Sequence, residues 1–470
     1  MQEVILNIAS KANAYLSDYI LIVLLVGVGL YFTIRTRFVQ VRCFGEGMRK
    51  VFGNIKLRGG KQESGLSSFQ ALATAIAAQV GTGNIVGASG AILIGGPGAI
   101  FWMWIIAFLG MATIYAEAVL AQETRQKNAD GSISGGPVYY IRKAFPGGFG
   151  KFLSVFFSIA IILALGFMGC MVQSNSIAES CNTALGIPGW VVGLILVIIS
   201  AIIFLGGIQR IASVTEKLVP VMAVLFLLGG LGILIARIQY LPQTIGMIFR
   251  YAFTPSALIG GGIGYALKTA ISQGAKRGLF SNEAGMGSTP HAHAMANVAK
   301  PHDQGVVAMI GVFIDTFVVL TMTALVVISC LYAGNGILAG LEGEAYLAAT
   351  SGASALVSKT NAMQMAFGSV FGSTFGNIFI AVCLLFFAFS TILSWNFFGK
   401  VNVEYLSKKN KTTVAIYSVV AIAFIFLGTL LKNDLVWELT DFFNYLMVLP
   451  NAIALLALGK IVAEAAKKTK

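Results

Sequence analysis

The chain has 470 residues, of which 57% are hydrophobic and only 11% are charged. Soluble proteins carry about 25% charged residues, so this composition excludes a soluble globular protein and indicates an integral membrane protein. The formal net charge of +13 could suggest a nucleic-acid partner, but the basic residues are spread over many loops, so we expect no nucleic-acid partner.

Apolar runs near 20 residues long recur along the whole sequence, and each can cross a bilayer as a helix. We therefore expect an all-α membrane protein, with polar connections at 274–304 and 334–365 that hold short helices. The N-terminus lacks the basic region and cleavage site of a signal peptide. The eleven predicted spans are 17–34, 66–94, 98–122, 152–180, 189–206, 216–236, 257–273, 305–333, 366–396, 413–431 and 443–459.

The basic residues also predict the orientation. An odd number of spans places the termini on opposite sides, and with the N-terminus outside most Lys and Arg residues fall in inner segments, including 35–65 and 274–304. This asymmetry follows the positive-inside rule. We expect a bacterial-type plasma membrane protein with its N-terminus outside and its C-terminus in the cytoplasm. The basic residues left outside are Lys11, Arg237, Arg250, Lys359 and Lys432.

The second span contains the segment Gln79-Val80-Gly81-Thr82-Gly83-Asn84-Ile85-Val86-Gly87. Such a glycine-rich interruption predicts a broken helix, which hydrocarbon tolerates only where the break is buried in protein or lines a cavity. Its free amides attract anions and its free carbonyls bind cations. Thr82, Gly83 and Asn84 are thus candidates to bind a substrate carboxylate. The alternative is that the glycines serve only close helix packing.

A second interruption is expected in the seventh span, at Ser272-Gln273-Gly274. Matching interruptions in two halves point to a transporter site at a repeat interface. The first span stands apart, and the remaining ten divide into two sets of five, which would be inverted repeats. We predict an N-terminal helix with a basic segment at 1–65, a first five-helix repeat at 66–256 and a second at 257–470.

Several motifs support a resemblance to a known family. The chain resembles the alanine or glycine:cation symporter family, within the amino acid–polyamine–organocation superfamily, over nearly its full length. The resemblance implies a leucine-transporter-type fold, coupling to sodium or protons, and small neutral amino acids as substrates. The motifs are Gly81-Thr82-Gly83-Asn84-Ile85, Gly95-Gly96-Pro97-Gly98, Ala116-Glu117-Ala118, Gly135-Gly136-Pro137, Gln173-Ser174-Asn175, Arg277-Gly278-Leu279-Phe280-Ser281-Asn282-Glu283-Ala284-Gly285 and Phe389-Ser390-Thr391-Ile392-Leu393-Ser394-Trp395.

The resemblance also implies a sodium site. In related folds, sodium lies between a Ser-Thr pair and carbonyls of the first broken helix, which here places Ser390 and Thr391 opposite the carbonyls of Ala77 and Val80. Hydroxyls and carbonyls are hard oxygen donors suited to an alkali cation. The alternative is that both hydroxyls bond carbonyls of their own helix.

Five further residues are candidates for the substrate pocket: Gln173, Trp395, Ile271, Gly274 and Phe167. Gln173 lies in the middle of the fourth span, where a buried amide needs partners, and the resemblance directs it to the substrate. Trp395 follows the Ser-Thr pair by one turn and could close the pocket on the cytoplasmic side. Ile271 and Gly274 would bound the pocket at the second break. The alternatives are a helix–helix hydrogen bond for Gln173 and an interfacial anchor for Trp395.

Charged residues inside spans are functional candidates by default. Lys268 could titrate or hold a helix by pairing, of which pairing is favoured, and the partners of Asp315 and Glu117 cannot be assigned. The segment at 290–293 has two histidines, but no cysteine is near, so no metal centre is expected. No nucleophile–base pair or carboxylate dyad suggests an enzyme, and five scattered cysteines indicate no disulfide framework.

The combined interpretation is a secondary-active importer of alanine or glycine coupled to sodium, working by alternating access. It would need an amino acid, a sodium ion and a lipid bilayer, with no other cofactor and no obligate protein partner. The alternatives are proton coupling, a glutamine- or serine-type symporter, or, from a different class, an ion channel or an amino acid sensor.

Overall fold

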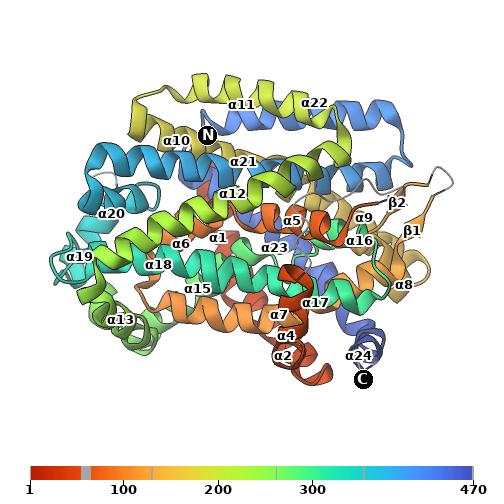
Figure 1. Ribbon diagram of the computed structural model, residues 1–470, viewed down its shortest axis with the longest axis horizontal. Helices are drawn as coiled ribbons and strands as arrows, with labels where there is room; N and C mark the ends of the chain where they lie inside the picture. Colours follow the sequence, from red (N-terminus) through yellow and green to blue (C-terminus); the bar gives the residue numbers. More distant parts are fainter. Residues whose placement is uncertain (1, 54–64, 129–130, 261, 353–354, 468–470) are drawn as a thin grey trace.

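A computed structural model describes residues 2–53, 65–128, 131–260, 262–352 and 355–467. Part of the predicted basic segment, residues 54–64, lies outside the described residues. The molecule is a helical bundle in which α13, α19 and α20 gather at one end, while α8, α24 and a small β hairpin gather at the other (Figure 1).

The helices of the first half begin with the N-terminal unit and end at the long helix α12. They are α1 (Gln2–Tyr15), η1 (Leu16–Leu21), α2 (Ile22–Arg35), α3 (Val39–Arg42), α4 (Phe44–Phe52), α5 (Ser68–Gln79), η2 (Gly83–Gly87), α6 (Ala88–Gly95), α7 (Ala99–Thr124), α8 (Pro137–Ala144), α9 (Gly148–Ile161), η3 (Ile162–Gly169), α10 (Cys170–Leu185), α11 (Gly189–Phe204) and α12 (Gly207–Ala236).

The second half is also helical and ends at the C-terminal helix α24. Its helices are η4 (Ile238–Tyr240), α13 (Leu241–Phe253), α14 (Ser256–Ile259), α15 (Ile263–Asn282), α16 (Pro290–Ala294), α17 (Pro301–Val312), η5 (Phe313–Leu320), α18 (Thr321–Val327), η6 (Ile328–Tyr332), α19 (Gly343–Thr350), α20 (Ala362–Phe371), α21 (Ser373–Leu406), α22 (Lys411–Gly428), α23 (Asn433–Ala457) and α24 (Gly459–Lys467).

One antiparallel hairpin interrupts the helical pattern. Strands β1 (Gln126–Lys127) and β2 (Ile133–Ser134) pair with Gln126 opposite Ser134 and Lys127 opposite Ile133.

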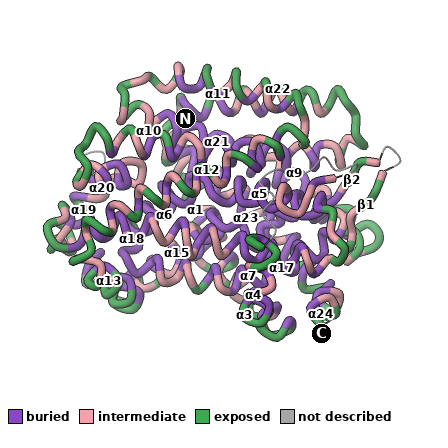
Figure 2. The backbone as a smooth tube through the Cα atoms, viewed as in Figure 1, coloured by how far each residue is buried: buried purple, intermediate pink, exposed green. Residues whose placement is uncertain are grey.

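The centre of the bundle is buried, whereas α11 and α22 expose much of their surface (Figure 2). Many of the exposed side chains on these outer helices are apolar, among them Ile198, Ile202 and Val419. Large exposed apolar faces on long helices match a hydrocarbon surrounding instead of water.

In the described part of the chain, eight helices are long and apolar enough to cross a membrane, or nine if α5 and α6 form one bent span. Each of the eleven predicted spans overlaps a helix. However, α11 has only 16 residues, and the 20 residues of α15 include Lys268, Lys276 and Arg277. The membrane-helical fold is therefore clear, while the count of eleven spans stays a prediction.

The first predicted break is confirmed. A capping box of Ser67 and Gln70 starts α5, and helix α5 stops at Gln79 because Val80 leaves the helical region with ψ 86°. The chain resumes a helical path at Gly83, and the two halves are bent by 45°.

The second predicted break, at Ser272-Gln273-Gly274, is wrong. Helix α15 is continuous to Asn282, and the chain turns at Glu283, which has a left-handed φ of 58°. Gly274 serves packing instead: an added Cβ would lie 2.6 Å from Trp102 Cβ and 2.8 Å from the Ala99 carbonyl oxygen of α7. The interruption thus lies after residue 282, before α16.

Candidate functional site

The break between α5 and η2 lies at the centre of a buried polar cluster. The Gly81 N–H donates to Asn84 Oδ1 at 3.0 Å, and the Thr82 N–H donates to Gln173 Oε1 of α10 at 3.1 Å. Thr82, Asn84 and Gln173 are fully buried. Side chains from two helices therefore cap amides that the break sets free.

The break approaches its neighbours too closely for side chains at its glycines. A Cβ added to Gly83 would lie 3.0 Å from Phe280 Cδ1 and 3.1 Å from Ser281 Cα. Gly81 faces Thr391 Oγ1 and Gln173 Oε1. The last turn of α15 and the middle of α21 thus form the walls around the break.

Two hydrogen-bond donors beside the break have no partner in the described part of the chain: Thr82 Oγ1 and Gln173 Nε2. A hydroxyl and an amide NH₂ are both donors, and a buried donor without an acceptor costs free energy. Each of the two groups could therefore donate to a bound acceptor.

Three of the four predicted cation ligands, Ala77, Ser390 and Thr391, come together near the end of α5. The Thr391 hydroxyl donates to the Ala77 carbonyl at 2.8 Å, and the Ser390 hydroxyl lies 3.4 Å from the same oxygen. Both hydroxyls also bond the Phe387 carbonyl of their own helix, at 3.1 and 2.8 Å. Val80 is the residue at which α5 ends, three positions after Ala77. The structure thus combines the cross-helix contact with the alternative contact inside the helix.

Asp315 is a part of the site that sequence reasoning could not place. Its Oδ1 accepts from Asn84 Nδ2 at 2.7 Å, and its two oxygens accept from the Ser281 hydroxyl at 3.0 and 2.9 Å. Thr316 donates to it as well. The carboxylate is fully buried and lies in η5, which packs against η2. Asp315 therefore fixes the Asn84 side chain and joins the break to α15.

Trp395 closes the cluster on the side toward α16. Its indole N–H donates to Glu283, and its ring makes an edge contact with Phe280 at 5.7 Å between centroids. In the turn that follows Glu283, the Gly285 and Gly287 amides donate to Glu117 of α7 at 3.1 and 2.9 Å. These bonds hold the turn after α15 in place.

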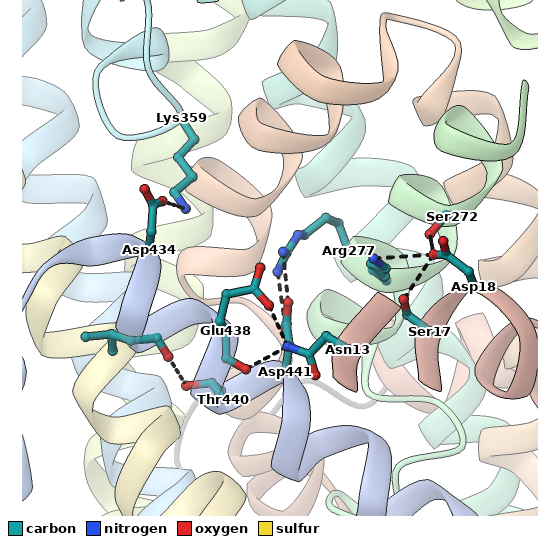
Figure 3. Close-up of polar contacts among 12 residues, drawn as sticks. Asn13, Ser17, Asp18, Ser272, Arg277, Lys359, Asp434, Glu438, Thr440 and Asp441 are labelled. Atoms are coloured by element: carbon teal, nitrogen blue, oxygen red, sulfur yellow. Dashed lines mark hydrogen bonds and ion pairs between the residues drawn. The ribbon is translucent and has the colours of Figure 1, made fainter. Parts of the chain in front are cut away.

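Two ion pairs lie on the side of the site where α15 faces α23, and Figure 3 shows both of them. Arg277 of α15 binds Asp441 of α23 at 2.9 Å and lies over the Trp437 ring at 4.7 Å. Trp437 in turn packs against Phe280 with centroids 4.7 Å apart, and Lys359 pairs with Asp434 at 2.8 Å. The break residues are fully buried, so the site is closed to solvent.

The N-terminal unit contacts this layer as well (Figure 3). Asp18 accepts from Ser272 at 2.6 Å and pairs with Lys268 at 3.0 Å and Lys276 at 3.5 Å. The expected structural pairing of Lys268 is thus observed. The prediction that Lys276 and Arg277 lie in a loop was wrong, because α15 continues through both residues.

Three predicted pocket residues lie away from the break. Phe167 stacks on Phe424 of α22, with centroids 4.8 Å apart. Gly274 packs on α7. Ile271 precedes Ser281 by ten residues, which is about 15 Å along a helix. Both α15 predictions followed from placing the break too early.

The two histidines of α16 are buried and hydrogen bonded. His291 Nε2 contacts Asn402 Nδ2 and His293 Nδ1 contacts Gln304 Nε2, both at 2.8 Å. A different group, Cys43, Glu46 and His302, could approach a metal ion in the described residues, but His302 already contacts Tyr115 at 2.7 Å through Nδ1 and Glu46 at 3.3 Å through Nε2.

Comparisons with known proteins identify the family and the fold of the chain. The chain is 38% identical over 462 residues to the sodium/alanine symporter AgcS of Methanococcus maripaludis, covering 98% of this chain and 96% of that protein. It is 37% identical over 467 residues to a Bacillus subtilis protein named Probable sodium/glutamine symporter GlnT, covering 99% and 91%. The crystal structure of MhsT in complex with L-phenylalanine covers 87% of this chain and 97% of that chain, with a TM-score of 0.57 and 15% identity. This likeness shows a leucine-transporter-type fold. The model of the sodium:alanine symporter family matches residues 2–470, so the chain belongs to that family of membrane transporters.

Proposed function

We propose that this transporter imports alanine or glycine together with sodium by alternating access. The observation that carries the proposal is the pair of unpartnered donors, Thr82 Oγ1 and Gln173 Nε2, beside the broken helix. An amino acid carboxylate supplies two acceptor oxygens, and its charge is favoured by half-helix amides without a buried Arg.

The proposed substrate is small because the walls leave little room. Gly83 lies against Phe280 and Ser281, and Trp395 closes the inner side. We assign the carboxylate to Thr82, Gly83, Asn84 and Gln173, and a side chain no larger than a methyl group to the space near Phe280 and Trp395.

The proposed sodium site consists of the Ala77 and Val80 carbonyls with the Ser390 and Thr391 hydroxyls. Its support is the convergence of both hydroxyls on the Ala77 carbonyl. Sodium there would tie α5 to α21 and so position the neighbouring amides of the break. The proposed orientation keeps the N-terminus outside, so that the Arg277 layer is outer and the Trp395 side is inner.

Proton coupling is the second candidate, and a specific observation favours it. The fully buried carboxylate of Asp315 is bound only by the uncharged Asn84, Ser281 and Thr316 among the described residues. A buried carboxylate without a cation favours a neutralising proton or a bound ion.

Equilibrium binding to purified protein tests the site. Labelled alanine should bind in sodium and bind weakly in potassium, and Thr82→Val and Gln173→Leu should each weaken binding at least tenfold. Gln364→Leu is the matched control, because Gln364 is another buried amide that bonds backbone carbonyls elsewhere. Unchanged alanine affinity in both site variants would contradict the assignment.

A further inference from the structure

A groove with apolar and basic walls opens where α21 ends and α22 begins. Its cavity has a volume of about 890 Å³. One wall is apolar and comes from the α11–α12 turn and from α22, with Phe204, Leu205, Ile208, Val419 and Ile422. The other wall carries Lys400, Lys409 and Lys411.

An adjoining cavity of about 700 Å³ extends the basic wall. It shares Val401, Glu404 and Lys409 with the first cavity and adds Arg142, Lys143 and Lys408. Six cations thus face one carboxylate, that of Glu404. In the described part of the chain, none of the six forms an ion pair within 4.0 Å. The two cavities therefore carry an excess of positive charge, which Glu404 offsets only in part.

The turn that carries two of these lysines has an unusual backbone. Lys408 and Lys409 have left-handed φ angles of 52° and 63°, which costs about 1–2 kcal/mol per residue for an L-residue with a Cβ. The Lys409 N–H donates to the Glu404 carbonyl at 2.7 Å, and Asn410 caps α22. A strained, hydrogen-bonded turn holds the lysines at the mouth of the groove.

We propose that this groove binds an anionic phospholipid of the surrounding leaflet, with the phosphate among the lysines and an acyl chain along the apolar wall. The charges lie at helix ends, where headgroups lie, and the apolar wall runs from Val414 to Ile422, about 12 Å along the helix. Basic pockets between membrane helices are known sites for such headgroups.

The groove also touches the segment that leads into the broken helix. Gly65, Leu66 and Met295 line it, and the Leu66 N–H donates to the Met295 carbonyl at 2.9 Å, directly before α5. A bound lipid would therefore contact the segment at 65–66, which leads directly into α5, the first half of the broken helix. The proposal needs the membrane setting but not the proposed substrate or cation.

Lipid retention tests the proposal. The purified transporter is reconstituted in nanodiscs of equimolar phosphatidylglycerol and phosphatidylcholine, released, and analysed for retained lipid by native mass spectrometry. Wild type should retain phosphatidylglycerol in preference. At about 1 kcal/mol per lysine near the headgroups, the triple variant K400Q/K409Q/K411Q should lose this preference roughly 100-fold. The variant K151Q/K460Q/K467Q removes three positive charges outside the groove and should keep the preference for phosphatidylglycerol.

A second variant tests the apolar wall without changing charge. Ala415 is exposed and lines the groove, so Ala415→Trp should displace the acyl chain and lower phosphatidylglycerol retention while the lysines remain. Equal retention by wild type and the lysine triple, or an equal loss in the control triple, would overturn the site. Displacement of the lipid by soluble glycerol phosphate would overturn the role of the acyl chain.

Discussion

The two hydroxyls opposite Ala77 give the sharpest prediction. Ser390→Ala with Thr391→Ala removes two of the four proposed sodium ligands, while the backbone carbonyls stay. Interactions with a charged group contribute about 1.5–3 kcal/mol each, and 1.4 kcal/mol corresponds to a factor of ten. The sodium concentration for half-maximal alanine uptake should therefore rise roughly 100-fold or more, with protein abundance little changed.

Ser394→Ala is the matched control. Ser394 lies one turn further along α21, is fully buried, and donates to the Thr74 carbonyl of α5 at 2.9 Å. The Ser394→Ala variant therefore loses a comparable cross-helix hydrogen bond, worth about 1 kcal/mol, and keeps all four proposed sodium ligands. Uptake measured in proteoliposomes over a range of sodium should be nearly normal for this control. An equal shift in both proteins would refute the sodium site and indicate a packing effect.

Four other predictions follow from the geometry. Gly83→Ala should lower alanine uptake because its Cβ would lie 3.0 Å from Phe280, whereas Gly87→Ala, with its nearest neighbour at 3.6 Å, should stay active; two equally active proteins would contradict the tight approach. Asp441→Asn removes the ion-pair partner of Arg277, and the two side chains are only 5% and 12% exposed. The substitution should therefore lower the free energy of unfolding by about 3–5 kcal/mol and lower the melting temperature. Asp434→Asn, at a side chain 76% exposed, should cost under about 1 kcal/mol; similar melting temperatures would argue against the buried layer. Leucine should fail to displace alanine at equal concentration in a competition assay, and displacement would end the small-pocket proposal. In a cysteine-free background, an impermeant thiol reagent should label Leu6→Cys and not Lys460→Cys in intact cells, and the reverse pattern would invert the proposed orientation.

Local sequence signals predicted the parts of the site that depend on local chemistry. The break at 80–83 was predictable because two glycines flank a polar residue within an apolar run, and the helix does end at Gln79. The meeting of Ala77 with Ser390 and Thr391 was expected from the resemblance, and the structure brings these residues together.

The remaining features depend on contacts between distant segments. Gly274 resembled a helix breaker, but it accommodates Trp102 of α7. A glycine in an apolar run can therefore mark either a helix break or a close contact between helices. The residues that meet the break, Phe280 and Ser281, lie just before the real turn at Glu283. Asp315 bonds Asn84 across 231 positions, which no local pattern encodes.

Phe167 shows a different limit. It lies in η3, a stretch of π-helix from Ile162 to Gly169. A wide turn shifts the face that each following side chain occupies relative to an ordinary helix. The helical spacing therefore could not show that Phe167 faces Phe424 of α22.

The most direct test of sodium-coupled import is uptake of labelled alanine into proteoliposomes with sodium and pH gradients imposed separately. An inward sodium gradient at equal pH should drive accumulation above equilibrium, and the Ser390→Ala, Thr391→Ala protein should lose it at ordinary sodium concentrations. Accumulation driven by a pH gradient alone without sodium, and unchanged in the double variant, would contradict the account and assign the coupling to protons.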